Sequence, residues 1–173
     1  GSVGKAQVLT EVRLAGVAEG SPGEGELQLR GPNITPGYYE NPEATAAAST
    51  EDGWLATGDV GRRDAEGYYY IVDRIKDMFI SGGENVYPAE VERVLDTHPA
   101  ILEVAVIGVP DKKWGETGAA FVLLRPGAEL EAEALRSWCR ERLAGYKVPA
   151  HLRLVGDFPR TAAGKIRKPE LRR

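Results

Sequence analysis

Three side chains in this sequence have the chemistry needed to bind a phosphorylated ligand. Asp59 ends the segment Thr57-Gly58-Asp59, Arg74 follows another aspartate, and Lys165 follows a glycine near the C-terminal end. An aspartate and an arginine can together hold the two neighbouring hydroxyls of a ribose, because a planar guanidinium suits paired oxygens. A lysine on a glycine-flanked loop can place its charge beside a phosphate or a developing oxyanion. The combination predicts a nucleotide ligand.

Each of these side chains also has an ordinary explanation. Gly58-Asp59 could be a simple turn, because aspartate readily bonds its own backbone. Lys165 could belong to a solvated basic end or to a nucleic-acid surface, since other cations surround it, namely Arg160, Arg167, Lys168, Arg172 and Arg173. No aromatic residues alternate with these cations and the net charge is -4, so nucleic acid is not expected as a partner. Lys165 also lacks the following Ser or Thr of a Walker A loop.

A second glycine-rich segment, Ser81-Gly82-Gly83-Glu84-Asn85, allows two interpretations. Gly82 and Gly83 could supply the unusual dihedral angles of an ordinary turn. Alternatively, the missing side chains could let a thin ligand arm pass close to the backbone. Both interpretations stay open at this point.

The composition predicts a folded protein from a reducing compartment, the cytoplasm. The 173 residues are 42% hydrophobic and 28% charged, enough for one large or two small domains. Cys139 is the sole cysteine, and His98 and His151 are the two histidines, so neither a disulfide nor a metal site is expected. Cys139 is predicted to pack in a core and His98 to complement a helix C-terminus. No apolar run is long enough for a membrane span, and Gly1-Ser2 is typical of a cloning remnant.

The elements that must position these side chains fall into two groups, which together predict the α+β class. The first, up to residue 73, is a small β-rich unit, because its apolar residues alternate with period two. We expect strands at Glu11–Leu14, Glu26–Arg30, Val60–Arg63 and Tyr68–Val72, a turn at Asp64–Gly67, and a short helix that Pro42 opens.

After residue 73 the pattern changes to alternating helices and strands. Residues 74–77 are predicted to be a hinge, and residues 78–173 an α+β lobe. We expect a helix from Pro88 toward Pro99, strands at Glu103–Val109, Thr117–Leu124 and Leu152–Val155, and a helix at Leu130–Ala144.

In their order along the chain, these motifs resemble those of the adenylate-forming enzymes, the family of acyl-CoA synthetases, luciferases and peptide-synthetase adenylation domains. The matching segments are Val3-Gly4-Lys5, Gly25-Glu26-Leu27, Gly37-Tyr38-Tyr39, Trp54–Asp59, Asp73–Asn85 and Pro159–Lys165. The family's phosphate loop and its acyl and adenine pocket lie upstream of these motifs and have no counterpart here. The resemblance therefore implies the C-terminal third of a larger enzyme, with residues 1–73 as the last, truncated part of its large N-terminal lobe.

The resemblance also assigns roles to the candidate residues. Asp59 and Arg74 would hold the ribose of ATP and of the acyl-adenylate. Lys165 would reach the α-phosphate and the substrate carboxylate, and its surroundings resemble a site that protein acetyltransferases modify. Gly82 and Gly83 would line the channel for the pantetheine arm of CoA, and Lys76 occupies the family's hinge position, about which the C-terminal lobe rotates.

The implied function is that of an ATP-dependent, AMP-forming acyl-CoA ligase that uses Mg²⁺ and CoA. A fatty acid is preferred over an aryl acid as the substrate, and the fragment alone is expected to be inactive. Two alternatives stay open: an adenylation domain that loads a carrier protein, and a non-catalytic module. Trp114 either packs against its own loop or belongs to the surface that faces CoA and the rest of the enzyme.

Overall fold

The structure, a computed structural model, describes residues 1–172 and divides into two compact units. The first is Gly1–Lys76 and the second begins at Asp77, so the division falls within the predicted hinge. Each unit has its own sheet, which is antiparallel in the first unit and mixed in the second, and the predicted α+β class is confirmed. No helix in the described residues is long and apolar enough to cross a membrane.

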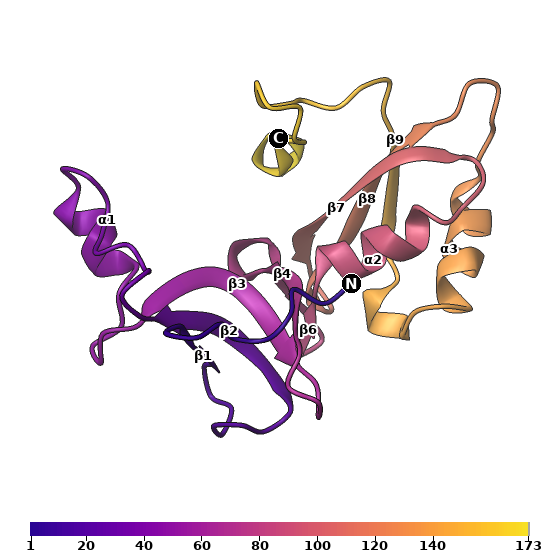
Figure 1. The fold of residues 1–173 in the computed structure, drawn as a ribbon. Helices are drawn as coiled ribbons and strands as arrows, with labels where there is room; N and C mark the ends of the chain where they lie inside the picture. The colour runs from indigo at the N-terminus through magenta and orange to yellow at the C-terminus, as the bar shows by residue number, and fades with distance from the viewer. Residues whose placement is uncertain (173) are drawn as a thin grey trace. The chain divides into compact units, whose positions relative to one another are not determined.

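The first unit is built on a four-stranded antiparallel sheet in the order β1-β2-β3-β4 (Figure 1). Its strands are β1 (Glu11–Leu14), β2 (Gly23–Arg30), β3 (Leu55–Arg63) and β4 (Tyr69–Arg74). The short helix α1 (Pro42–Ala47) follows β2, and the Asn41 side chain caps it by accepting a hydrogen bond from the Ala44 amide at 2.9 Å. The expected strands and the proline-opened helix are therefore present.

Two irregularities interrupt the pairing of this sheet. The register between β2 and β3 shifts between Glu26 and Gln28, and the register between β3 and β4 shifts between Val60 and Gly61. The neighbouring residues Leu27 and Gln28 are both buried, although the regular pairing of β2 with β1 directs them to opposite faces of the sheet. Bulges of this kind bend a strand and re-aim its side chains.

The second unit contains a five-stranded sheet in which β6-β5-β8-β7 are neighbours and β9 runs parallel to β8. Its strands are β5 (Phe79–Ser81), β6 (Glu84–Val86), β7 (Ile101–Asp111), β8 (Gly115–Leu124) and β9 (His151–Leu154). Its α-helices are α2 (Pro88–Leu95) and α3 (Ala132–Arg140). Short 3₁₀ helices lie at Ile75–Asp77, Gly145–Lys147 and Lys168–Arg172.

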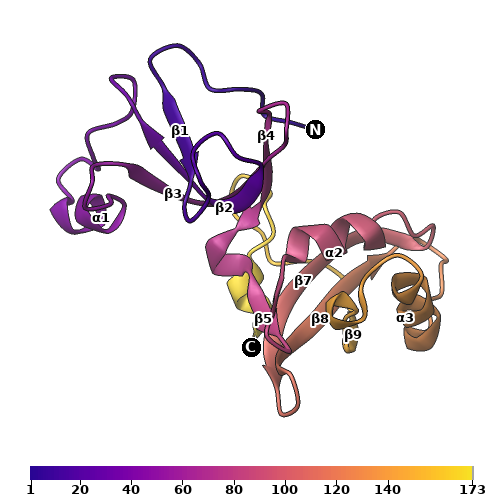
Figure 2. The same cartoon turned by 90° about the horizontal axis from the view of Figure 1, so that it is seen from below.

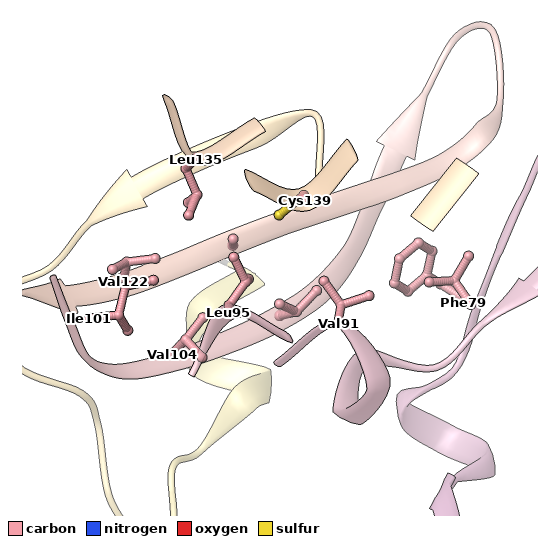
Figure 3. Packing of buried hydrophobic residues seen from close by; sticks show 11 residues of the cluster. Phe79, Val91, Leu95, Ile101, Val104, Val122, Leu135 and Cys139 are labelled. Carbon is pink, nitrogen blue, oxygen red and sulfur yellow. The ribbon is translucent and has the colours of Figure 1, made fainter. Parts of the chain in front are cut away.

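The long ribbon formed by β7 and β8 is buried on both faces. Helices α2 and α3 cover one face, and Figure 3 shows Leu135 and Cys139 pointing from α3 toward the sheet beside Leu95 of α2. On the other face, Phe158 and Leu171 from the C-terminal segment pack against Ile107 and its neighbours. Figure 2 shows both helices against this ribbon. The C-terminal segment is therefore anchored by its own apolar side chains.

Two predicted helices are shorter than expected. The helix that begins at Pro88 ends at Leu95 instead of continuing toward Pro99, because Thr97 turns back to bond the Val94 carbonyl with its hydroxyl at 2.6 Å. A residue that precedes a proline, here His98, also avoids the helical region. The second predicted helix is confined to Ala132–Arg140 and is followed by a separate 3₁₀ turn.

We predict that Leu95→Ala lowers the free energy of unfolding by about 2–5 kcal/mol, because it leaves a cavity at a fully buried position. Leu102→Ala is the matched control, since that leucine is 46% exposed and its loss should cost less than about 0.5 kcal/mol. Urea denaturation followed by circular dichroism measures both. Equal losses would show that α2 does not form the core of the second unit.

Candidate functional site

The structure brings Asp59 and Arg74 together on the sheet of the first unit. They are directly paired in the register of β3 and β4, and the Arg74 Nε lies 3.0 Å from the Asp59 Oδ1. The side chain of Arg74 is 59% exposed and that of Asp59 27%. An ion pair this exposed contributes at most about 1 kcal/mol to folding. The pair is thus a solvent-facing carboxylate and guanidinium held side by side, which suits the recognition of vicinal hydroxyls.

The backbone before Asp59 is fixed by side-chain hydrogen bonds. The Thr57 hydroxyl donates to the Leu27 carbonyl at 2.8 Å and accepts from the Asp59 amide at 3.1 Å. Gly58 has a φ of 73°, in the left-handed region that favours glycine, and its amide donates to the Glu26 carboxylate at 3.1 Å. Gly58-Asp59 is therefore not a turn but part of a bulged segment within β3, and this segment sets the direction of Asp59. Sequence reasoning assigned no role to Thr57, although a threonine hydroxyl can bond the backbone amide two residues on.

Lys165 lies in the second unit at the end of a tight hairpin loop. The Thr161 amide donates to the Lys165 carbonyl at 2.8 Å, and the Gly164 amide donates to the Thr161 carbonyl at 2.9 Å. Gly164 has a φ of 79°, which closes the turn as a glycine in a three-residue hairpin loop commonly does. The Lys165 amide also donates to the Thr161 hydroxyl at 3.2 Å. The backbone of Lys165 is therefore held while its side chain is exposed.

Three of the cations near Lys165 in the sequence are paired with carboxylates. Arg160 pairs with Glu103 at 2.6 Å and also donates to the Gly164 carbonyl at 3.2 Å. Two further ion pairs join Arg167 to Glu170 at 2.7 Å and Lys168 to Glu92 at 2.8 Å. Within residues 1–172 no carboxylate lies at ion-pair distance from the Lys165 ammonium. Lys165 thus differs from a member of a uniformly solvated basic end, and it is available to an anionic ligand.

Gly82 and Gly83 form the two-residue turn of the β5–β6 hairpin. Their φ angles are 62° and 89°, the pattern of a turn that requires left-handed residues at both central positions. A Cβ on Gly82 would approach the Trp114 ring to 2.8 Å, and the Gly82 amide donates to the Trp114 carbonyl at 2.9 Å. The turn interpretation of these glycines is therefore sound, and Trp114 packs on the turn while remaining 46% exposed. Their role toward a ligand stays a prediction.

Cys139 and His98 have structural surroundings. Cys139 is 1% exposed, and burial raises the pKa of its thiol. His98 lies beyond the end of α2, its Nδ1 accepts from the Ala100 amide at 3.2 Å, and its ring meets Trp138 edge to face at 4.8 Å. Burial, and then the charge of Arg142, lower the pKa of His98. The expectation that this imidazole complements the helix dipole is therefore wrong, because a neutral ring that accepts a hydrogen bond does not act as the cation.

Lys76, the predicted hinge residue, lies at the boundary between the two units. Lys76 is exposed, belongs to the 3₁₀ helix Ile75–Asp77, and is the last residue of the first unit. Its role as a pivot stays a prediction. No group of three or more His, Cys, Asp or Glu side chains in the described residues is arranged to hold a metal ion.

The sequence of this chain is similar to a known family of enzyme domains and to several CoA ligases. A protein-family profile described as "AMP-binding enzyme C-terminal domain" matches residues 90–165. A feruloyl-CoA synthase from an Amycolatopsis species is 49% identical over 176 residues, which is 100% of this chain and 36% of the relative. A 2-succinylbenzoate-CoA ligase from Geobacillus kaustophilus is also 49% identical, over 177 residues, again 100% of this chain and 36% of the relative.

A solved structure supports the same relationship. The o-succinylbenzoate CoA synthetase from Bacillus subtilis, in complex with its acyl-adenylate intermediate, has a TM-score of 0.89 and 41% identity, covering 100% of this chain and 36% of that one. The chain is homologous to the C-terminal part of the adenylate-forming enzymes, so the resemblance inferred from the motifs is confirmed. It spans about a third of the length of these relatives.

We predict that Gly82→Ala and Gly83→Ala destabilise the second unit to different extents. Both place a Cβ at a left-handed position, which costs about 1–2 kcal/mol. Only Gly82→Ala also collides with Trp114, since a Cβ on Gly83 meets open space. We expect Gly82→Ala to cost about 1–3 kcal/mol more and to shift the tryptophan emission. Urea denaturation and fluorescence measure this, and equal effects would contradict the packing of Trp114 on the turn.

Proposed function

We propose that this chain is the C-terminal part of an ATP-dependent, AMP-forming acyl-CoA ligase. The observation that carries the proposal is Lys165, a lysine on a fixed turn. Three neighbouring cations are paired with carboxylates, whereas Lys165 has no such partner among residues 1–172. The homology to CoA ligases supports it. The Asp59–Arg74 pair adds a second element that fits a nucleotide.

In the first half-reaction, a carboxylate oxygen of the acid attacks the α-phosphorus of ATP, and the bond to pyrophosphate breaks. Asp59 and Arg74 hold the ribose hydroxyls, which fixes the nucleotide for attack. The Lys165 ammonium stabilises the negative charge that gathers on the transferring phosphoryl group. Mg²⁺ enters as the complex with ATP. The product is an acyl-adenylate.

In the second half-reaction, the thiol of CoA attacks the acyl carbonyl and AMP leaves. The Gly82-Gly83 turn, with Trp114 packed on it, lines the path of the pantetheine arm in this proposal. A change of the backbone dihedrals at Lys76 carries Lys165 away and brings the turn in, so that one pocket serves both steps. The buried free thiol of Cys139 fits the expected cytoplasmic setting, in which thiols stay reduced.

The substrate class is a carboxylic acid. The names of the relatives include aromatic acids, in feruloyl-CoA synthase and 2-succinylbenzoate-CoA ligase, and also a fatty acyl CoA synthetase from Mycobacterium tuberculosis at 46% identity and a TM-score of 0.67. The preference for a fatty acid stays a prediction. A panel of fatty and aryl acids supplied to the complete enzyme, with CoA and a carrier protein as competing acceptors, decides both the acid and the acceptor.

We predict that the 173-residue chain alone binds Mg-ATP weakly and releases no pyrophosphate. The Asp59–Arg74 pair supplies few contacts, and these rarely exceed the ordering and translational cost of binding. Calorimetry with Mg-ATP, and a pyrophosphate assay with the same acids, measure this. Sustained turnover by this chain would show that it does not depend on a larger enzyme.

We predict that Lys165→Ala in the complete enzyme slows adenylate formation roughly a hundred- to a thousandfold, the scale for losing one preorganised electrostatic contact. Thioester formation from added acyl-adenylate and CoA should continue at near the normal rate, because Lys165 has then left the pocket. Acetylation of Lys165 by a protein acetyltransferase, which removes the same charge, should have the same effect.

Lys112→Ala is the control for this prediction, because it removes an exposed lysine from a different turn of the second unit. It should leave adenylate formation unchanged. Unaltered adenylation in Lys165→Ala, or an equal loss of both half-reactions, would mean that the lysine has another role.

A further inference from the structure

The carboxylate of Glu26 contacts the bulged segment of β3 that carries Asp59. Glu26 lies on β2 beside the bulge, where the register with β3 shifts. Its Oε1 accepts the Gly58 amide at 3.1 Å, and this amide belongs to a residue with left-handed φ. The carboxylate therefore occupies the place that a strand carbonyl takes in a regular ladder, and it satisfies a donor that the bulge has displaced.

Glu26 is itself held by a chain of hydrogen bonds across the sheet. The amide nitrogen of Gln28, a residue only 6% exposed, donates to the Glu26 Oε2 at 3.3 Å. The Gln28 Oε1 accepts from the Arg13 Nε at 2.8 Å, and Arg13 grips Asp52 with both terminal nitrogens, at 2.6 and 3.0 Å. Hydrogen bonds from Arg13, and then from Thr50, lower the pKa of Asp52 to about 2, so the Asp52 carboxylate at the end of this hydrogen-bond network stays charged. Each polar atom in this chain fixes the next.

We infer that Glu26 is a positioning residue for the Asp59–Arg74 pair, and this inference rests on the proposed function. Gly58 is the residue directly before Asp59, so the hydrogen bond that its amide donates to Glu26 sets the dihedral angles that aim the Asp59 carboxylate. The Thr57 hydroxyl holds the same segment by donating to the Leu27 carbonyl. Loss of the Glu26 contact leaves Asp59 attached but misdirected, which weakens the grip on the ribose and leaves the phosphoryl chemistry of Lys165 intact.

The test uses the complete enzyme with Glu26→Ala and Glu26→Gln, and Glu24→Ala as the control, because Glu24 is an exposed glutamate on the same strand. Glu26→Ala should raise the KM for ATP roughly tenfold, the effect of one lost hydrogen bond to a charged group, with little change in kcat. The preference for ATP over 2′-deoxy-ATP or 3′-deoxy-ATP should fall by a similar factor, because the misplaced carboxylate no longer reads the hydroxyls. Glu24→Ala should change neither value.

A paired exchange separates positioning from general destabilisation. In Glu26→Gln the new amide still accepts from Gly58, but its nitrogen faces the amide nitrogen of Gln28, and two donors cannot bond. The double variant Glu26→Gln/Gln28→Glu restores a donor facing an acceptor, and the new carboxylate still accepts from Arg13. We expect an intermediate KM for the single variant and a KM within about twofold of normal for the double variant.

The outcomes are distinct. A complete wild-type enzyme that forms no acyl-adenylate from any acid overturns the proposed function. If the wild-type enzyme is active but Glu26→Ala changes neither the KM for ATP nor the preference for ATP, the role of Glu26 is overturned and the proposed function is not. The same holds if the KM for ATP of the double variant is no lower than that of Glu26→Gln. Amide hydrogen exchange on the 173-residue chain gives an independent reading, because Gly58 should lose protection in Glu26→Ala and keep it in Glu24→Ala.

Discussion

The burial of both faces of the β7–β8 ribbon is the constraint on which the second unit depends. A long antiparallel hairpin with apolar residues on both faces needs other elements packed against each face, because exposed apolar surface is unfavourable in water. Helices α2 and α3 cover one face, and Phe158 and Leu171 cover the other. Phe158 and Leu171 lie on either side of the hairpin loop of Lys165 in the sequence, so their packing also fixes the two ends of the segment that carries this loop. The exposed lysine is therefore held by hydrophobic packing on either side of it.

In the first unit, a small sheet carries the exposed ion pair of Asp59 and Arg74. Its apolar core is modest, formed by Leu14, Leu27, Trp54 and Val60. The register shift leaves the Leu27 carbonyl and the Glu26 carboxylate of β2 bonded to the bulged segment Thr57–Asp59 of β3. Side chains therefore hold the segment that carries Asp59, whereas a regular ladder would bond the Leu27 carbonyl to a backbone amide.

The local sequence predicted most of the regular elements. Period-two alternation located β1 and β2, the Asp64–Gly67 turn separated β3 from β4, and Pro88 marked the start of α2. The β5–β6 hairpin escaped prediction, because strands of three residues show no periodicity. The parallel pairing of β8 with β9 was equally invisible, since it joins segments separated by a helix.

By itself, the sequence determined the class of protein and indicated the candidate site residues, because motif order and residue chemistry are local properties. Asp59, Arg74 and Lys165 became candidates in this way. Only the tertiary structure decided what holds them. Three contacts join residues that are distant in the chain. They are the hydrogen bond between Gly58 and Glu26, the ion pair between Arg160 and Glu103, and the packing of Trp114 against Gly82. Such contacts depend on strand register and packing, which arise only when the separate elements meet in the folded chain.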